Sequence, residues 1–390
     1  MKHISIPGNT PPDRFLFIDG LRGVAAMMVV FFHMKLILSD AVGRWFPPWL
    51  DTLFGHGDLG VDVFFVLSGF VIAHSIRDGD HTFQYLGKYA LRRSIRLDPP
   101  LWAAILLEIV LIQVSLYFYP DLGTKTPTLK QVLVNIAYLQ EMLHVGNVIA
   151  VLWSLTYEVQ FYFISVSFLV AVRLIRRWDV QIPWSKVFAY SLMVLAYTYS
   201  IAIYQNLVPT PLRGIFLERW FQFFLGVMAW AVLRHKLPQW VFVMAWTVCL
   251  VSTLVLAPSG YRTQSSLCAL LISVLILWVG SSGRMDRLLS GNVSQFLGKI
   301  SYSLYLLHLP IGWRFGSLMK RLAGNELSVI TGTTVFVGSV AASVFAAWLM
   351  HRILEAPSMN IARKVRLPKR SDKLPSSNDL LKLSGSHLNL

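Results

Sequence analysis

The sequence predicts an all-α fold, a multi-pass transmembrane helical bundle of about ten spans. Of its 390 residues, 55% are hydrophobic and only 14% are charged, and the mean hydropathy is +0.56. A soluble protein of ordinary composition carries roughly 25% charged residues. The missing charge therefore indicates a protein surface that faces lipid.

Each expected span is an apolar run close to the ~20 residues that a helix needs to cross the hydrocarbon core. The apolar run at 131–140 is too short to cross, so we expect it to lie in the membrane interface or to re-enter the membrane. The spans are expected near residues 15–38, 59–76, 97–119, 148–172, 185–208, 213–233, 238–257, 262–280, 296–319 and 328–354.

Lysine and arginine are distributed unevenly between alternate connections. The set that includes both ends of the chain holds about 23 of them, and the opposite set holds about 7. Because cytoplasmic connections carry the excess, we expect both termini in the cytoplasm. This basic rim, in contact with membrane lipid, explains most of the net charge of +15 without a nucleic-acid partner. The expected domains are a cytoplasmic segment at 1–14, a membrane domain at 15–356 and a basic, disordered cytoplasmic tail at 357–390.

The first span carries three polar residues on one face. At 100° per residue, Arg22 and His33 differ in direction by about 20°, and Asp19 lies about 40° from His33. Charged side chains at membrane depth face a bundle interior or a wet cavity, and they are usually functional. The alternatives are a purely structural role in contacts between helices, or a proton path.

Acidic residues also fall at membrane depth in later spans. Asp62 lies near the outer end of the second span, where an antiparallel neighbour brings it towards His33. Glu158 lies about 15 Å into the fourth span from the outside. Glu108 and Glu218 are less informative, and we expect Glu218 to pair with nearby arginines in a structural role.

Two further groups of residues share helix faces. Ser301, Tyr305 and His308 have the spacing of one face of the ninth span. Arg93 and Arg96 share a face just before the third span, on the cytoplasmic side. Arginine binds phosphate in a bidentate manner, although a plain topological anchor is the alternative. The sequence shows no metal-binding motif, and its two cysteines lie in apolar runs, which argues against a disulfide or a zinc site.

Six short motifs follow one another from about Asp19 to Pro357. DGLRG opens the series, with histidine eleven positions after its arginine, and RRSIRL holds an Arg-x-x-Arg pair. The others are GVDVFFVLSGFVI, LWSLTYE, ISYSLYLLH and EAP. Together they resemble the acyltransferase-3 family of integral-membrane O-acyltransferases, the bacterial glycan O-acetylases. The positions to which we assign supporting roles are Asp19, Ser68, Trp153, Ser154, Tyr157, Ser301, Tyr305, His308 and Glu355.

The resemblance implies transfer of an acyl group, most often acetyl, to a hydroxyl of a cell-surface or exported glycan. It implies acyl-CoA, chiefly acetyl-CoA, as a cytoplasmic co-substrate, with no permanently bound cofactor. It further implies a bacterial inner-membrane location, a glycan or lipid-linked saccharide as acceptor, and transfer either unaided or with glycan-assembly proteins. His33 matches the family's presumed catalytic histidine, and Arg93 and Arg96 match its presumed donor-binding arginines. Asp98 departs from the pattern, because an aromatic residue commonly follows the Arg-Leu pair.

These assignments predict a mechanism. The phosphates of CoA would bind Arg93 and Arg96, and its thin arm would follow a narrow polar shaft past Arg22 to His33, about 16 Å along the helix. His33 would act as the general base, with Glu158 or Asp62 orienting its ring. The candidate oxyanion donors are Ser68, Tyr157 and Ser301. A covalent acyl-histidine intermediate is an alternative.

Two other classes of protein are compatible with buried polar residues in a helical bundle. A proton-coupled secondary transporter would use the same charges as a substrate path, but we see no pair of interrupted helices at matching positions in two halves. A non-catalytic assembly or sensor protein is the third possibility. An assay with labelled acetyl-CoA distinguishes the enzyme from both.

Overall fold

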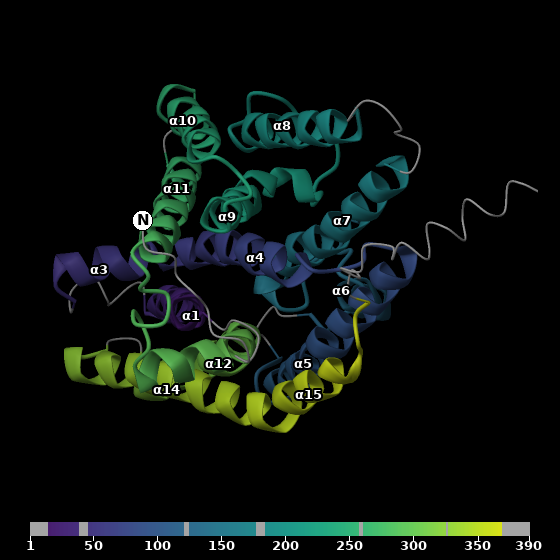
Figure 1. The fold of residues 1–390 in the computed structure, drawn as a ribbon. Helices are drawn as coiled ribbons and strands as arrows, with labels where there is room; N and C mark the ends of the chain where they lie inside the picture. Colours follow the sequence, from purple (N-terminus) through teal and green to yellow (C-terminus); the bar gives the residue numbers. More distant parts are fainter. Residues whose placement is uncertain are drawn as a thin grey trace, which may run out of the picture.

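The computed structural model describes residues 15–38, 46–120, 125–176, 184–256, 260–324 and 327–368, and within these ranges the regular elements are helices (Figure 1). In chain order they are α1 (Leu16–Ile37), α3 (Pro48–Gly55), α4 (Gly60–Ile76), α5 (Phe83–Phe118), α6 (Leu129–Ile136), α7 (Trp153–Arg176), α8 (Trp184–Tyr204), α9 (Trp220–Leu233), α10 (Gln239–Val255), α11 (Tyr261–Ser281), α12 (Asn292–Leu307), α13 (Arg314–Ala323), α14 (Val329–Met350) and α15 (Ala356–Lys364).

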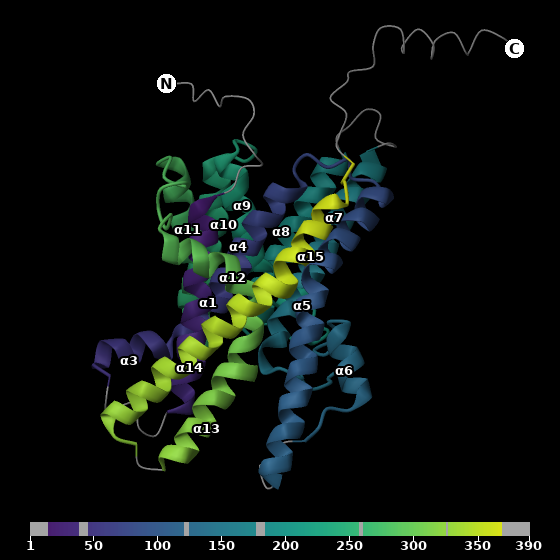
Figure 2. The same ribbon diagram turned by 90° about the horizontal axis from the view of Figure 1, so that it is seen from below.

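The helices confirm the predicted all-α multi-pass membrane fold. Within the described ranges, seven helical stretches are long and apolar enough to cross a membrane. Helices α9 and α10, with 14 and 17 residues, are apolar but shorter. The total of about ten spans and the cytoplasmic position of the termini stay predictions. In Figure 2 the start of α1 and the end of α15 lie at the same end of the bundle.

Helix α1 lies inside the bundle, where it packs against α12 and α4 (Figure 1). Its contact with α12 requires glycine. A Cβ atom on Gly23 would lie 2.6 Å from the backbone nitrogen of Gly298, and one on Gly298 would lie 2.2 Å from the carbonyl oxygen of Asp19. Small residues allow helix backbones to approach closely in this way. Gly23 of the DGLRG motif and Gly298 of α12 therefore allow the close packing of α1, the helix that carries Arg22 and His33.

Helix α5 is 36 residues long and begins well before the expected span at 97–119. Thr82 caps its N-terminus, where its side chain accepts a hydrogen bond from the Tyr85 backbone N–H at 3.1 Å. Pro99 and Pro100 lie inside the helix and lack the N–H groups that would bond to the preceding turn. At 1.5 Å per residue the helix is about 54 Å long, which exceeds the ~30 Å hydrocarbon core.

Two π-helical turns interrupt long helices. The turn η5 (His308–Trp313) joins α12 to α13, so the span expected at 296–319 is not one regular helix. The turn η6 (His351–Glu355) joins α14 to α15. The helix thus continues to Lys364, and α15 packs against α5, so the predicted start of the tail at residue 357 lies within ordered structure. Residues 1–14 and 369–390 lie outside the described residues.

The apolar run at 131–140 forms the short helix α6 followed by turns. Thr128 caps α6 through its side chain, which accepts a hydrogen bond from the Gln131 backbone N–H. Eight helical residues are about 12 Å long, too short to cross a bilayer, as expected.

Candidate active site

The imidazole rings of His33 and His308 face each other inside the bundle. The Nδ1 atom of His33 lies 3.3 Å from the Nε2 atom of His308, and the ring centres are 4.9 Å apart. His33 lies near the end of α1, and His308 begins the π-helical turn after α12. The sequence placed both residues among the candidates, but it did not predict their contact.

The hydrogen bonds of this pair define which nitrogen of His33 is available. His33 Nδ1 lies 2.9 Å from the carbonyl oxygen of Val29, so Nδ1 carries the proton and donates it. His308 Nδ1 lies 3.2 Å from the carbonyl oxygen of Leu304, which leaves Nε2 of His308 as an acceptor. His33 Nδ1–H is thus directed at Val29 and His308. The Nε2 atom of His33 keeps its lone pair and can act as a base.

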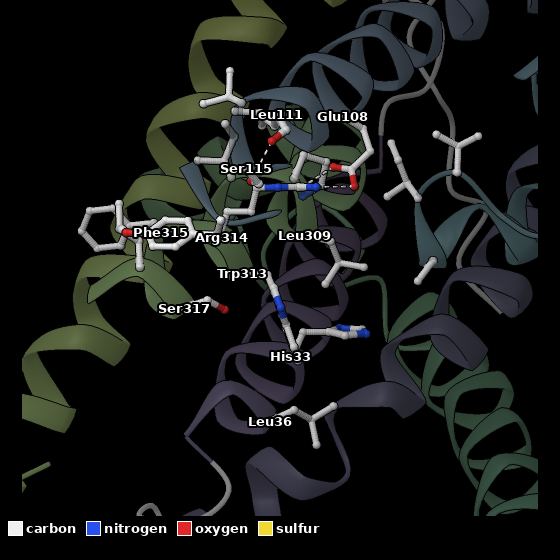
Figure 3. Close-up of a pocket in the computed structure, with 18 of the residues that line it drawn as sticks. His33, Leu36, Glu108, Leu111, Ser115, Leu309, Trp313, Arg314, Phe315 and Ser317 are labelled. Carbon is white, nitrogen blue, oxygen red and sulfur yellow. Dashed lines mark hydrogen bonds and ion pairs between the residues drawn. The ribbon is translucent and has the colours of Figure 1, made fainter. Parts of the chain in front are cut away.

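His33 lines a large cavity of about 1020 Å³ (Figure 3). The walls come from α1, the second half of α5, residues 147–150, the turn η5 and α13. Small-molecule sites usually enclose roughly 300–1,000 Å³, so this cavity has room for a substrate. It leaves room for a small molecule beside the imidazole of His33.

An ion pair that the sequence did not predict lines the same cavity. Both Nη atoms of Arg314, the first residue of α13, contact the carboxylate of Glu108 on α5, at 2.5 and 2.9 Å. Figure 3 shows this bidentate contact on a different side of the cavity from His33. Glu108 was uninformative in the sequence because its partner lies 206 residues away.

Three arginines gather around a second, narrow cavity of about 40 Å³. Arg22 of α1 and Arg93 and Arg96 of α5 line it. Among the described residues, Nε of Arg22 is buried without a hydrogen-bond partner. The guanidinium of Arg93 lies 4.0 Å from the ring centre of Tyr162, a cation–π contact, and in the described part of the chain no hydrogen bond occupies its N–H groups. The predicted cluster of Arg22, Arg93 and Arg96 therefore exists, with donors that an anion can use.

Glu158 lines the arginine cavity rather than the cavity of His33. Its Oε1 atom accepts a hydrogen bond from Ser68 at 2.9 Å and another from the hydroxyl of Tyr162. The expectation that Glu158 orients the imidazole of His33 is therefore wrong for this structure. Helix α7 places Glu158 at the same cavity as Arg22, Arg93 and Arg96 instead.

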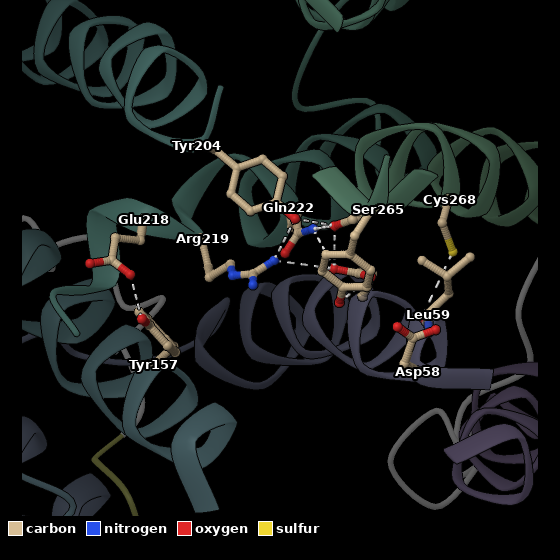
Figure 4. A network of polar contacts seen from close by, with 11 residues as sticks. Asp58, Leu59, Tyr157, Tyr204, Glu218, Arg219, Gln222, Ser265 and Cys268 are labelled. Carbon is tan, nitrogen blue, oxygen red and sulfur yellow. Dashed lines mark hydrogen bonds and ion pairs between the residues drawn. The ribbon is translucent and has the colours of Figure 1, made fainter. Parts of the chain in front are cut away.

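Asp62 is fully buried in a different network. Figure 4 shows three of its partners, Arg219, Gln222 and Ser265. Its Oδ1 atom accepts hydrogen bonds from Gln222 of α9 and Ser265 of α11, both at 2.6 Å, and lies 3.5 Å from Nη1 of Arg219. The expectation that Asp62 approaches His33 is also wrong, because α4 turns this side chain towards α9 and α11. Its contacts join three helices, which is a structural role.

The three predicted oxyanion donors, Ser68, Tyr157 and Ser301, donate their hydrogen bonds to other groups of the protein. Ser68 donates to Glu158, and Tyr157 donates to Glu218 at 2.5 Å. Ser301 donates to the carbonyl oxygen of Gly298 in its own helix at 3.0 Å. None of these hydroxyls lines the large cavity. The expected pairing of Glu218 with arginine is replaced by its contact with Tyr157 (Figure 4).

The Trp-Ser-Leu-x-x-Glu motif connects the parts of the site. The guanidinium of Arg219 lies 5.3 Å from the ring centre of Trp153, and Ser154 Oγ lies 2.7 Å from the hydroxyl of Tyr305. Tyr305 also donates to the carbonyl oxygen of Val151 at 3.1 Å. Within one and a half turns of α7, Trp153 thus contacts the network of Asp62, Ser154 contacts Tyr305, and Glu158 lines the arginine cavity.

The two cavities share no lining residue, so the structure does not show the single continuous shaft that the sequence predicted. Phe64 lines the arginine cavity, and its ring centre lies 6.0 Å from that of Tyr305. The Tyr305 ring centre lies 5.9 Å from that of His308. These two aromatic side chains separate the arginines from the histidine pair.

The remaining positions, Glu355, Asp98 and Asp19, line neither cavity. Glu355, nearly fully buried, accepts hydrogen bonds from Ser303 at 2.6 Å and from His351 at 2.9 Å. Asp98, the residue that departs from the family pattern, accepts hydrogen bonds from Ser94 and from Tyr138 at 2.9 Å. Burial raises the pKa of the Tyr138 hydroxyl, which keeps it a donor to Asp98. Asp19 lies on α1 but lines neither cavity.

Comparison with known proteins identifies relatives along most of the chain. The acyltransferase-3 family, described as an acyltransferase domain, matches residues 15–352. A putative membrane-bound transacylase of Komagataeibacter xylinus, BcsY, is 28% identical over 322 residues, covering 77% of this chain and 73% of its own length. An acyltransferase of Streptomyces mycarofaciens, MdmB, is 24% identical over 94% of this chain and 97% of its own length. A putative O-acetyltransferase of Staphylococcus aureus is 24% identical over 87% of this chain, which spans 56% of that relative.

No solved structure matches the chain at a significant level. The family match nevertheless covers α1 to the second π-helical turn, and it includes every residue of the two cavities. The chain therefore belongs to the acyltransferase-3 family, and it is a multi-pass membrane acyltransferase.

Proposed function

We propose that this acyltransferase moves an acetyl group from cytoplasmic acetyl-CoA to a hydroxyl of a cell-surface or exported glycan, in the inner membrane of a bacterium. The observation that carries the proposal is the His33–His308 pair, which leaves Nε2 of His33 unprotonated beside a large cavity. The name of the Staphylococcus aureus relative, an O-acetyltransferase, supports acetyl as the group transferred.

The donor would bind at the arginine cavity. Its phosphates would accept hydrogen bonds from Arg93 and Arg96, as the free N–H groups of the cluster allow. Arg22 and His33 lie on the same uninterrupted helix, eleven residues or about 16 Å apart. The pantetheine arm would cover that distance and pass between Phe64 and Tyr305. Movement of these two rings is therefore a required step of the proposal.

His33 would act as the general base. As the acceptor oxygen attacks the thioester carbonyl, Nε2 of His33 removes the hydroxyl proton. The carbon–sulfur bond then breaks, and the thiolate of CoA takes up that proton to leave as the free thiol. His308 accepts from Nδ1–H and holds the ring in the reactive tautomer, the role that we had expected of a carboxylate.

The test is acetyl transfer by the purified protein in lipid nanodiscs. Acetyl-CoA labelled in its acetyl group is supplied together with the surface polysaccharide of the source bacterium. The proposal predicts label on the polysaccharide as an alkali-labile ester, dependent on the protein. A folded wild-type protein that consumes no acetyl-CoA and labels no polysaccharide would refute it.

A further inference from the structure

Besides its three arginines, the narrow cavity is lined by three tyrosines that come from different parts of the chain. Tyr138 follows the short helix α6, Tyr162 lies on α7 and Tyr302 lies on α12. A tyrosine side chain presents an apolar ring face with one polar atom at its edge. A site that bound only phosphate would make no use of such a surface.

Each of the three tyrosine hydroxyls donates its hydrogen to an acceptor of the protein. The pairs are Tyr138 with Asp98 at 2.9 Å, Tyr162 with Glu158, and Tyr302 with the carbonyl oxygen of Leu97 at 2.8 Å. A hydroxyl oxygen that has donated its hydrogen keeps lone pairs and can still accept a hydrogen bond. The cavity therefore combines donors on its arginines with acceptors on its tyrosines.

These two kinds of group match the two parts of a CoA molecule. The phosphates of CoA only accept hydrogen bonds, and arginine only donates them. The pantetheine arm carries methylene groups, which suit aromatic ring faces, and amide N–H groups, which suit hydroxyl oxygens. The tyrosines thus fit the arm of CoA rather than its nucleotide portion.

Tyr138 reaches the cavity from a backbone position that is unusual for an aromatic residue. Its φ angle is 57°, in the left-handed region that favours glycine. Its N–H bonds to the carbonyl oxygen of Asn135 at 3.2 Å, and the N–H of Leu139 bonds to that of Val134 at 3.0 Å. This is the Schellman arrangement that ends many helices, and its left-handed residue is usually glycine. The side chain of Tyr138 is therefore retained at a position where the backbone disfavours it.

Asp98 on α5 fixes the ring of Tyr138 from the opposite side. The carboxylate of Asp98 accepts hydrogen bonds from the hydroxyls of Tyr138 and of Ser94, one turn earlier in the same helix. Within the described ranges Asp98 forms no ion pair, so it leaves its neighbour Arg96 available for an anion. Asp98 does not line the cavity itself, and its effect on a ligand would pass through Tyr138.

We propose that Tyr138, Tyr162 and Tyr302 bind the pantetheine arm of the acyl donor, and that Tyr138 gives the site its preference for CoA over nucleotide phosphates alone. Asp98 is a positioning residue that acts through the hydroxyl of Tyr138. This inference rests on the proposed function, because it takes the arginine cavity as the phosphate site of CoA. It adds a separate surface for the arm, part of which comes from the segment after α6.

Two ligands test the arm separately from the phosphates. CoA carries both parts, and phospho-ADP, the nucleotide portion of CoA, lacks the arm. Both are titrated onto the full chain in lipid nanodiscs. Tyr138→Ala removes a ring face and a hydrogen-bond acceptor, so the Kd for CoA should rise about tenfold while the Kd for phospho-ADP stays unchanged. Arg93→Ala combined with Arg96→Ala should weaken the binding of both ligands.

The matched control is Leu139→Ala, because Leu139 is adjacent to Tyr138 but exposed and does not line the cavity. This variant should bind both ligands as wild type does. Tyr138→Gly replaces Tyr138→Ala should that variant not fold, since the positive φ angle favours glycine.

A double-mutant cycle tests the positioning role of Asp98. Asp98→Leu removes the acceptor of the Tyr138 hydroxyl and should raise the Kd for CoA several-fold, and Asp98→Asn keeps a carbonyl oxygen and should restore most of the affinity. In a Tyr138→Phe background, Asp98→Leu should have no further effect, because the hydroxyl is already absent. The same several-fold loss in both backgrounds would overturn the role of Asp98.

The arm site and the proposed function fail in different ways. Equal losses for CoA and phospho-ADP in folded Tyr138→Ala would overturn the arm site, and so would an unchanged Kd for CoA. A wild-type protein whose affinity for CoA depends on Tyr138, but which transfers no acetyl group, would refute the proposed function and still support the arm site. A wild-type protein that binds neither ligand would refute both.

Discussion

His33 Nδ1 and His308 Nε2 lie 3.3 Å apart, and both rings also bond to the carbonyl oxygen one helical turn before them. Two neutral imidazoles thus orient each other, without a carboxylate in contact with either ring in the described part of the chain. This arrangement keeps the pair uncharged in an apolar setting, where an isolated charge is costly. His33 at the same time lines the large cavity.

His308 should act as a positioning residue. His308→Phe removes the acceptor for Nδ1–H of His33, and a neutral hydrogen bond is worth about 1–1.5 kcal/mol, so we expect kcat to fall about tenfold. The KM for acetyl-CoA should change little. His308→Gln retains an acceptor and should recover part of the rate. Equal kcat values for wild type and a folded His308→Phe would show that the contact has no role in catalysis.

The arginine cluster should determine the affinity for the donor. Arg93→Ala combined with Arg96→Ala removes donors for phosphate, each worth about 1.5–3 kcal/mol, so the KM for acetyl-CoA should rise more than about tenfold. Arg92→Ala is the matched control, because Arg92 is adjacent but does not line the cavity. Steady-state kinetics with varied acetyl-CoA measure both. If the control and the double variant behave alike, these arginines only anchor the helix.

Substitutions of Asp62 and Arg219 should lower the free energy of unfolding rather than change the catalytic step directly. Arg219→Ala leaves the carboxylate of Asp62 buried without its ion-pair partner, which should cost about 3–5 kcal/mol of unfolding free energy. Adding Asp62→Asn removes the unpaired charge and should restore much of that loss. Thermal unfolding of the purified proteins in detergent gives the comparison. A double variant as unstable as Arg219→Ala would contradict this interpretation of the network.

The aromatic rings between the cavities should limit passage of the donor. Phe64→Ala removes the ring that lies 6.0 Å from Tyr305 and opens a path between the arginines and His33. We expect hydrolysis of acetyl-CoA without an acceptor to increase several-fold, because water can enter through the large cavity. Release of free thiol measures this rate. An unchanged rate in folded Phe64→Ala would indicate that the donor takes another route.

Hydropathy predicted the helices well, because a membrane requires apolar runs of a fixed length. The run expected at 238–257 became α10 at Gln239–Val255, for example. The π-helical turns at His308 and His351 were not predictable in this way, since an extra residue in a turn leaves the hydropathy of the run unchanged. The tail boundary at 357 was misplaced because α15 contains polar and basic residues, so hydropathy does not mark it as part of the bundle.

The partners of buried charges depend on segments that are distant in the sequence. Motifs and helical spacing identified His33, the arginines and His308. They could not show that Asp62 contacts Ser265, 203 residues later, or that Glu108 contacts Arg314. Periodicity shows which face a residue occupies but not which helix lies opposite that face. The carboxylates were therefore assigned to His33, although the fold gives them other partners.

The most direct test of the account is acetyl transfer by His33→Ala in nanodiscs, compared with wild type at equal amounts of folded protein. Positioned general bases contribute about 10²–10⁴-fold to rate, so the account predicts a loss of at least about a hundredfold. Transfer by folded His33→Ala at the wild-type rate would contradict the assignment of His33 as the base.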